Sequence, residues 1–120
     1  MKQKTGGENM DSKSDFKDWR EFLPQTTGNL LKMRQKAYSD GSIDSKYKIL
    51  MALGMAIVAK CEPCIKSYVD KAKEAGISDD EFKELLEVAI TFSGCVGEQW
   101  AIIAWNFWNK NNISKADSCC

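Results

Sequence analysis

The chain has 120 residues, 43% of them hydrophobic, and its 17 basic residues balance 17 acidic ones. This length favours a single domain, and the balanced charge argues against nucleic acid or an anionic membrane surface as a partner. The N-terminal segment is polar, without the apolar stretch of a signal peptide, and the longest apolar run, 49–59, is too short to span a membrane. We therefore expect a cytoplasmic protein with no membrane partner.

The cysteine and histidine content restricts the chemistry further. Five cysteines are present and histidine is absent, so mechanisms that need an imidazole, and mixed Cys/His zinc sites, are excluded. In a cytoplasmic chain, cysteines are more often catalytic, metal-binding or free than joined in structural disulfides. We expect no cofactor.

The pattern of apolar residues predicts an all-α domain of five to six helices between two polar tails. Glycine (8) and proline (2) are few, which suits helices better than a protein of strands and turns. We expect a disordered tail over 1–14, the domain over 15–110, and a flexible tail over 111–120 that ends in Cys119 and Cys120. These two cysteines have no assigned role.

The first helices are indicated by spacing and by helix-ending residues. Aromatic and apolar residues at helical intervals over 15–23 predict a short helix, or an aromatic segment lying over the core, that stops at Pro24. A second helix is expected to run from a capping residue within 26–29 to about residue 39, with Gly41 in the left-handed position after its end.

The third helix is expected to follow a cap at Asp44 or Ser45. Its interior, 49–59, is apolar nearly all round, which predicts burial on all sides, inside the domain or between subunits. Gly54 in its middle indicates a close approach of a neighbouring element.

The fourth and fifth helices carry clearer boundary signals. Pro63 suits the first turn of a helix that starts at Glu62 or Pro63 and runs to about residue 75, with Gly76 just after its end. The segment from Ser78 to Glu81 has the Ser-x-x-Glu pattern of a capping box, which opens the next helix.

The C-terminal part of the domain is expected to contain a break and then a last helix. Gly94 and Gly97 bracket Cys95, predicting a tight break there, and the last helix follows over 98–109. Cys95 is expected to be a small buried residue or, alternatively, a third redox thiol. The aromatic cluster of the last helix is expected in the core or in a subunit contact, and consists of Trp100, Trp105, Phe107 and Trp108.

The chemistry of the chain is expected at the Cys-x-x-Cys pair formed by Cys61 and Cys64. Two cysteines three positions apart in the first turn of a helix bring their sulfurs within bonding reach. The helix dipole and the unpaired amides of the first turn, together with Lys60 and Lys66, favour a thiolate, whereas Glu62 opposes it. A thiolate attacks peroxides and disulfides, and the second thiol can resolve the product.

Two other interpretations of the pair remain open. With Cys119 and Cys120 as a second pair it would form a cysteine-only metal site, although adjacent cysteines near a chain end are poor tetrahedral ligands. The two cysteines would alternatively be inert packing residues, since free cysteine is often simply buried.

The surroundings of the pair resemble the alkylhydroperoxidase AhpD-like, carboxymuconolactone decarboxylase family. The resemblance covers about residues 40–104 and is sharpest over 59–65, joined to Ala75-Gly76-Ile77-Ser78 and Glu87-Val88-Ala89. It implies an all-α fold that assembles as a homo-oligomer, a trimer or hexamer. It also implies thiol-dependent peroxidase or disulfide-reductase activity on a peroxide or disulfide substrate, with a thiol redox protein as partner.

The resemblance also implies roles for individual residues. Cys64 corresponds to the peroxidatic thiol and Cys61 to its partner. Tyr68 stands where the redox-active members have the relay histidine, and Ile49 stands where they have the relay glutamate. A phenol, with a pKa near ~10, is a poor base at neutral pH, so the expectation shifts from peroxide turnover towards dithiol–disulfide exchange. The alternative is a non-enzymatic oligomeric member with a binding or scaffold role.

Overall fold

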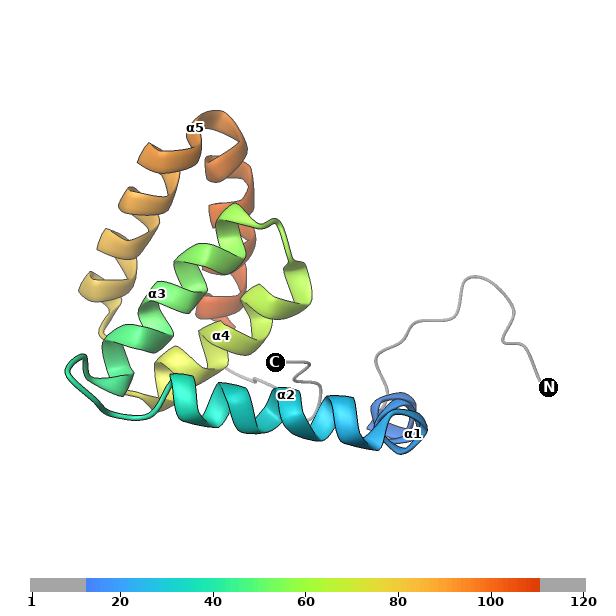
Figure 1. Ribbon diagram of the computed structural model, residues 1–120. Helices are drawn as coiled ribbons and strands as arrows, with labels where there is room; N and C mark the ends of the chain where they lie inside the picture. The colour runs from blue at the N-terminus through green and yellow to red at the C-terminus, as the bar shows by residue number, and fades with distance from the viewer. Residues whose placement is uncertain (1–12, 111–120) are drawn as a thin grey trace, which may run out of the picture.

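The computed structural model describes residues 13–110, and within them the chain forms helices and turns with no strand. Helices α3, α4 and α5 form the body, and α2 extends from it towards α1 at its far end (Figure 1). The all-α prediction is confirmed. The expected N-terminal tail lies largely, and the expected C-terminal tail wholly, outside the described residues. The first helix begins two residues before the expected start of the domain. The helices are α1 (Lys13–Phe22), α2 (Pro24–Ala37), α3 (Ser45–Val58), α4 (Glu62–Glu74) and α5 (Asp79–Asn109).

The core lies where α3, α4 and α5 meet. Leu53 of α3 and Ile65 and Val69 of α4 are completely enclosed, and each such side chain contributes about 1.5–3 kcal/mol relative to an exposed position. The buried residues of α3 recur every three or four positions, as expected for one helix face turned towards the core. They are Ile49, Ala52, Leu53, Ala56 and Ile57.

Helix α3 is buried on one face only within a single chain, so burial inside the domain accounts for part of its apolar surface. Met55 has 68% of its surface exposed, and Met51 and Val58 on the same side also face outwards. The reason is that α4 and α5 cover only one face of α3 within a single chain. The close approach expected at Gly54 is confirmed, since a Cβ atom there would lie 3.0 Å from the Leu85 Cδ2 of α5.

The N-terminal helices differ from expectation at two boundaries. Helix α2 begins at Pro24, not at a cap within 26–29, because proline is already suited to the first position of a helix. The hydroxyl of Thr27, expected near the cap, instead donates to the carbonyl of Leu23 at 2.7 Å. The placement of Gly41 was also wrong, since α2 ends at Ala37 with Tyr38 as the following cap residue.

Helix α5 reverses direction at Gly94. This residue has φ 67° and ψ −145°, a conformation that glycine alone adopts readily. Two limbs, 79–93 and 95–109, result, and the second folds back along the first (Figure 1). The predicted break is therefore confirmed at Gly94. Gly97 instead lies inside the second limb, where a Cβ would come within 2.9 Å of the Ala89 carbonyl oxygen.

Trp108 ties the end of α5 to its beginning and to α4. Its ring stacks on that of Phe82 with 4.2 Å between centroids. Its indole N–H donates to Asp79 Oδ1 at 2.8 Å, and the Lys73 ammonium of α4 donates to its carbonyl oxygen. Trp108 is thus a core residue, whereas Trp105 on the next face is half exposed.

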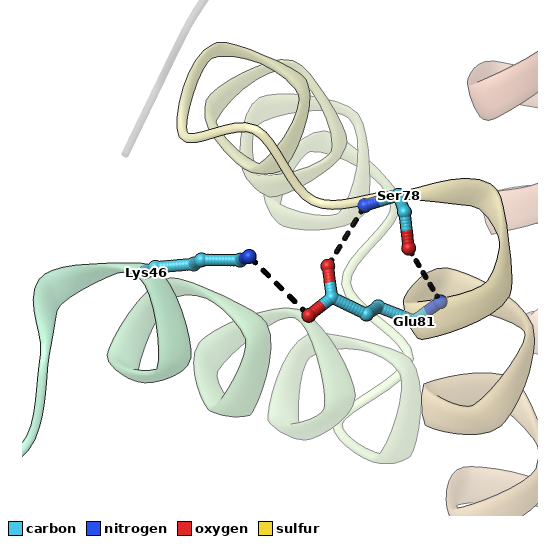
Figure 2. Close-up of polar contacts among 3 residues, drawn as sticks. All are labelled: Lys46, Ser78 and Glu81. Atoms are coloured by element: carbon cyan, nitrogen blue, oxygen red, sulfur yellow. Dashed lines mark hydrogen bonds and ion pairs between the residues drawn. The ribbon is translucent and has the colours of Figure 1, made fainter.

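The predicted capping box at the start of α5 is present (Figure 2). The Ser78 hydroxyl accepts from the Glu81 amide at 3.1 Å, and the Glu81 carboxylate accepts from the Ser78 amide at 2.9 Å. Lys46 of α3 reaches the same carboxylate at 3.3 Å. The backbone hydrogen bond from Ser78 is the main cause of a lowered Glu81 pKa. The ionised Glu81 carboxylate therefore stabilises the fold at neutral pH, and this stabilisation is lost as the pH falls through the lowered pKa.

Replacing Ser78 by alanine should destabilise the protein by about 1 kcal/mol, because the Glu81 amide loses its capping acceptor. Urea denaturation followed by circular dichroism measures the change. The control is Ser42→Ala in the exposed loop before α3, which should leave the denaturation midpoint unchanged. Equal midpoints for the two variants would contradict a stabilising role for the capping box.

Candidate functional site

The candidate site lies at the junction of α3 and α4. The amide of Lys60 donates to the Ile57 carbonyl at 3.1 Å, and the amide of Cys61 donates to the Ala56 carbonyl at 3.2 Å. This pair of bonds is the Schellman pattern that closes many helices, usually with glycine in the left-handed position. Here that position is held by Lys60 at φ 60°, which costs about 1–2 kcal/mol relative to an ordinary helical conformation.

Cys61 also opens α4. It is the N-cap residue of that helix, and its carbonyl accepts from the Ile65 amide at 2.9 Å. Glu62 is the first residue of α4, so Cys64 lies in the first turn, as the sequence predicts. First-turn amides have no acceptor within their own helix and sit at its positive end. A thiolate on Cys64 is therefore favoured by its position.

The two cysteines are joined by a disulfide in this structure, with their Cα atoms 5.2 Å apart. Both are partly exposed, and Cys64 also packs against the buried cluster of α3, α4 and α5. Cys61 and Cys64, which the sequence predicts to act together, are thus bonded, and the structure shows the oxidised form of the pair. A reductant reaching this end of α4 would return it to the dithiol.

Tyr68 lies one helical turn after Cys64, on the same face of α4. Its side chain is 7% exposed, and its hydroxyl is 2.7 Å from the hydroxyl of Tyr38. The two rings meet edge to face with 5.8 Å between centroids. The Lys71 ammonium lies 5.0 Å above the Tyr68 ring. The Tyr68 side chain therefore lies at the edge of the core, in contact with Tyr38 at the end of α2 and with Lys71 of α4.

Tyr38 was not identified from the sequence. It is thirty positions from Tyr68 and outside the segment that resembles the family, so no local spacing links the two residues. The only signal was an aromatic residue with a polar tip at the end of an amphipathic helix. Such a residue commonly buries its ring and seeks a hydrogen-bond partner.

The other position expected from the family relay holds a core residue. Ile49 is 7% exposed and packs in the buried cluster, so this position offers no proton acceptor. Among residues 13–110, no three His, Cys, Asp or Glu side chains are grouped so as to hold a metal ion. The metal hypothesis drew on Cys119 and Cys120, which lie outside the described residues.

Cys95 is exposed, and the expectation that it is buried was wrong. It directly follows Gly94, at the tip of the α5 reversal. A tip between two antiparallel limbs has no packed layer outside it, which is why a small apolar residue there remains at the surface. The disulfide pair belongs to a different junction, between α3 and α4.

A protein-family model matches most of the described part of the chain. The model of the carboxymuconolactone decarboxylase family matches residues 24–106. The chain belongs to the carboxymuconolactone decarboxylase family. The match includes α2 and Tyr38 as well as the disulfide pair, and the predicted relationship to this family is confirmed.

Two proteins illustrate the similarity. An uncharacterized protein of the cox locus of Paracoccus denitrificans is 30% identical over 59 residues, which are 49% of this chain and 53% of that protein. The chain therefore spans about half the length of the curated relative it matches. The crystal structure of an apo carboxymuconolactone decarboxylase family protein from Legionella pneumophila superposes with a TM-score of 0.76 at 23% identity. That match covers 79% of this chain and 85% of the other.

Family membership and the Cys61–Cys64 pair are compatible with thiol redox chemistry. The Legionella protein shows that the fold is shared. Over residues 13–110, no helix has both the length and the apolar character needed to cross a membrane.

Replacing Lys60 by glycine should stabilise the protein by about 0.5–1 kcal/mol, because glycine adopts a positive φ without steric strain. The matched control is Lys60→Ala, which removes the same charge but keeps a Cβ. Urea denaturation of the oxidised proteins should rank glycine above alanine. If alanine is as stable as glycine, the left-handed conformation at this junction imposes no strain.

Proposed function

We propose that this family member is a thiol-dependent oxidoreductase that cycles Cys61 and Cys64 between dithiol and disulfide. The observation that supports the proposal is the bonded pair at the start of α4, partly exposed and backed by the core. A sulfur at a helix N-terminus has a lowered pKa and a larger thiolate fraction at neutral pH. The reduced pair would therefore be reactive while its position stays fixed by two helices.

The reaction favoured is exchange with a substrate disulfide. The Cys64 thiolate attacks one substrate sulfur, breaking the substrate S–S bond and releasing a thiolate. Cys61, as a thiolate, then attacks the Cys64 sulfur of the mixed disulfide, which forms the intrachain bond and releases the second substrate thiolate. Two electrons pass to the substrate, and the dithiol of a redox partner protein reduces the pair again by the reverse sequence.

A peroxide is the second substrate class. Attack by the Cys64 thiolate would break the O–O bond, form a sulfenic acid and release an alkoxide or hydroxide that must gain a proton. Cys61 would then displace water from the sulfenic acid to form the disulfide. The leaving group needs a proton donor and the thiols need a base, and Tyr68 and Ile49 supply no base at neutral pH. Peroxide turnover should therefore be slower than exchange.

Tyr68 and Tyr38 have a supporting role in this proposal. If the Tyr38 hydroxyl donates to Tyr68, the hydrogen of Tyr68 is left for the Cys64 thiolate one turn away, and such a chain of hydrogen bonds strengthens each member. The pair would thus stabilise the thiolate without accepting its proton. This role is suited to disulfide exchange, which mainly needs an accessible thiolate.

We further propose that the protein acts in the cytoplasm as a homo-oligomer, a trimer or hexamer. The outward-facing Met51, Met55 and Val58 of α3 support assembly, because a nearly all-apolar helix seldom stays open to water. A second candidate function is a non-enzymatic oligomeric protein with a binding role. This second function is favoured because Tyr68 and Ile49 replace the relay histidine and glutamate of the redox-active members.

Serine variants of the pair test the enzyme proposal. Reduced wild-type protein, treated with a small aromatic disulfide, should release two equivalents of thiolate from the pair. Cys64→Ser should slow this reaction at least tenfold, whereas Cys61→Ser should trap a mixed disulfide on Cys64. The Cys95→Ser variant is the matched control and should behave as wild type at the pair. If the pair stays unreactive, the oxidoreductase proposal fails and the non-enzymatic binding role is the function that the structure supports.

Phenylalanine variants test the tyrosine pair. Tyr68→Phe should raise the midpoint pH of Cys64 alkylation by about 1 pH unit, because hydrogen bonds to a charged group contribute about 1.5 kcal/mol or more. Tyr38→Phe should give a smaller shift in the same direction. Tyr47→Phe on the exposed side of α3 is the control. A shift no larger than that control's would show that the phenols only pack.

A further inference from the structure

The two N-terminal helices form an arm, residues 13–37, that has little packing within its own chain. No residue of α2 is buried, and Leu31 and Met33 are 52% and 61% exposed. Helices α1 and α2 approach each other but not the backbone of α3, α4 or α5. Figure 1 shows α2 extending from the body to α1. Helices of 10 and 14 residues are only marginally stable in water when no face is packed. We therefore expect another surface to pack against the arm.

The body has an uncovered apolar groove, here called the α3–α5 groove. It has a volume of about 420 Å³ and runs between α3 and the first limb of α5, with Gly54 and Ala89 among its lining residues. Leu85 fills the space next to Gly54, and larger apolar side chains border the groove, which gives a surface that accepts a helix with an apolar face. The larger residues are Met51, Met55, Val58, Leu85, Val88 and Phe92.

Helix α2 of the arm and the edge of the groove carry opposite charges, whereas α1 contains both basic and acidic residues. Helix α2 contains Lys32, Arg34 and Lys36 and no acidic residue. Beside the groove, Glu84 and Glu87 are exposed and line an adjoining hollow together with Val88 and Phe92. Complementary charges at the edge of an apolar contact select the partner and fix its orientation. Helix α2 therefore matches the groove in both hydrophobicity and charge.

We propose that the arm of one copy lies in the α3–α5 groove of a second copy of this chain. Pairing of two grooves with each other would cover α3 but would leave both arms in water. One contact between arm and groove covers both surfaces. Such a contact joins different patches of the two copies, and repeated around an axis it closes into a ring. The inference rests on the proposed homo-oligomer but not on its thiol chemistry.

Serine variants of the full-length protein test which surfaces meet. The arm variant is Leu30→Ser with Met33→Ser, which lie on one face of α2, and the groove variant is Val88→Ser with Phe92→Ser. All four side chains are exposed in the single chain, so the body should stay folded. Circular dichroism should show a loss of helix no larger than that of a released arm. Light scattering should show that each variant falls from the oligomer to the mass of one chain. Ile43→Ser removes an exposed apolar side chain outside both surfaces and should keep the wild-type mass.

Charge reversal tests whether the arm meets the groove directly. Lys32→Glu with Lys36→Glu, and Glu84→Lys with Glu87→Lys, should each weaken assembly at least tenfold, and the four changes combined should restore it. The inference is overturned if the combination does not restore the mass, or if groove variants dissociate while arm variants stay assembled. A monomeric wild-type protein would end both the proposed oligomer and the inference, whereas an oligomer insensitive to arm changes would end the inference alone.

Discussion

The peptide units around Cys61 connect the two helices on which the site depends. The amide of Cys61 closes α3 through the Ala56 carbonyl, and its own carbonyl opens α4 through the Ile65 amide. A shift of this residue would therefore break the end of one helix and the start of the next, and Ile65 is fully enclosed in the core. The position of Cys64 in the first turn follows from the same bonds. Such preorganisation suits the proposed thiol cycle, in which the pair would change its oxidation state while its backbone keeps its place.

The tyrosine pair bears on the chemistry proposed for this site. A buried phenol needs a hydrogen-bond partner, and Tyr38 supplies one to Tyr68 from a helix that is otherwise outside the core. An imidazole at the position of Tyr68 would both donate and accept protons near neutral pH, whereas a phenol there only donates or accepts hydrogen bonds. With Ile49 packed in the core, neither of the two relay positions holds a base at neutral pH. Under the proposed function, this difference favours disulfide exchange over peroxide reduction.

The features predicted correctly from the sequence are those set by neighbouring residues. Pro63 in the first turn of α4, the capping box from Ser78 to Glu81 and the break at Gly94 each depend on a few adjacent positions, and all three are present. Two incorrect expectations were themselves local, since α2 starts at Pro24 and ends before Gly41. The exposure of Met55 and Cys95 in the single chain instead depends on contacts distant in sequence, because an apolar pattern does not identify the element that covers a face. The Tyr38–Tyr68 contact is of this second kind.

The location of Tyr38 connects the thiol site with the arm. Tyr38 caps the end of α2, so its hydroxyl is held against Tyr68 only while the end of α2 keeps its place beside α4. In a single chain the preceding helices contribute little to that placement, because α2 buries no residue. A neighbouring copy that held the arm would reduce the freedom of α2 and so favour the hydroxyl contact. In the assembly proposed above, the environment of Cys64 would thus depend on the neighbour through two phenols.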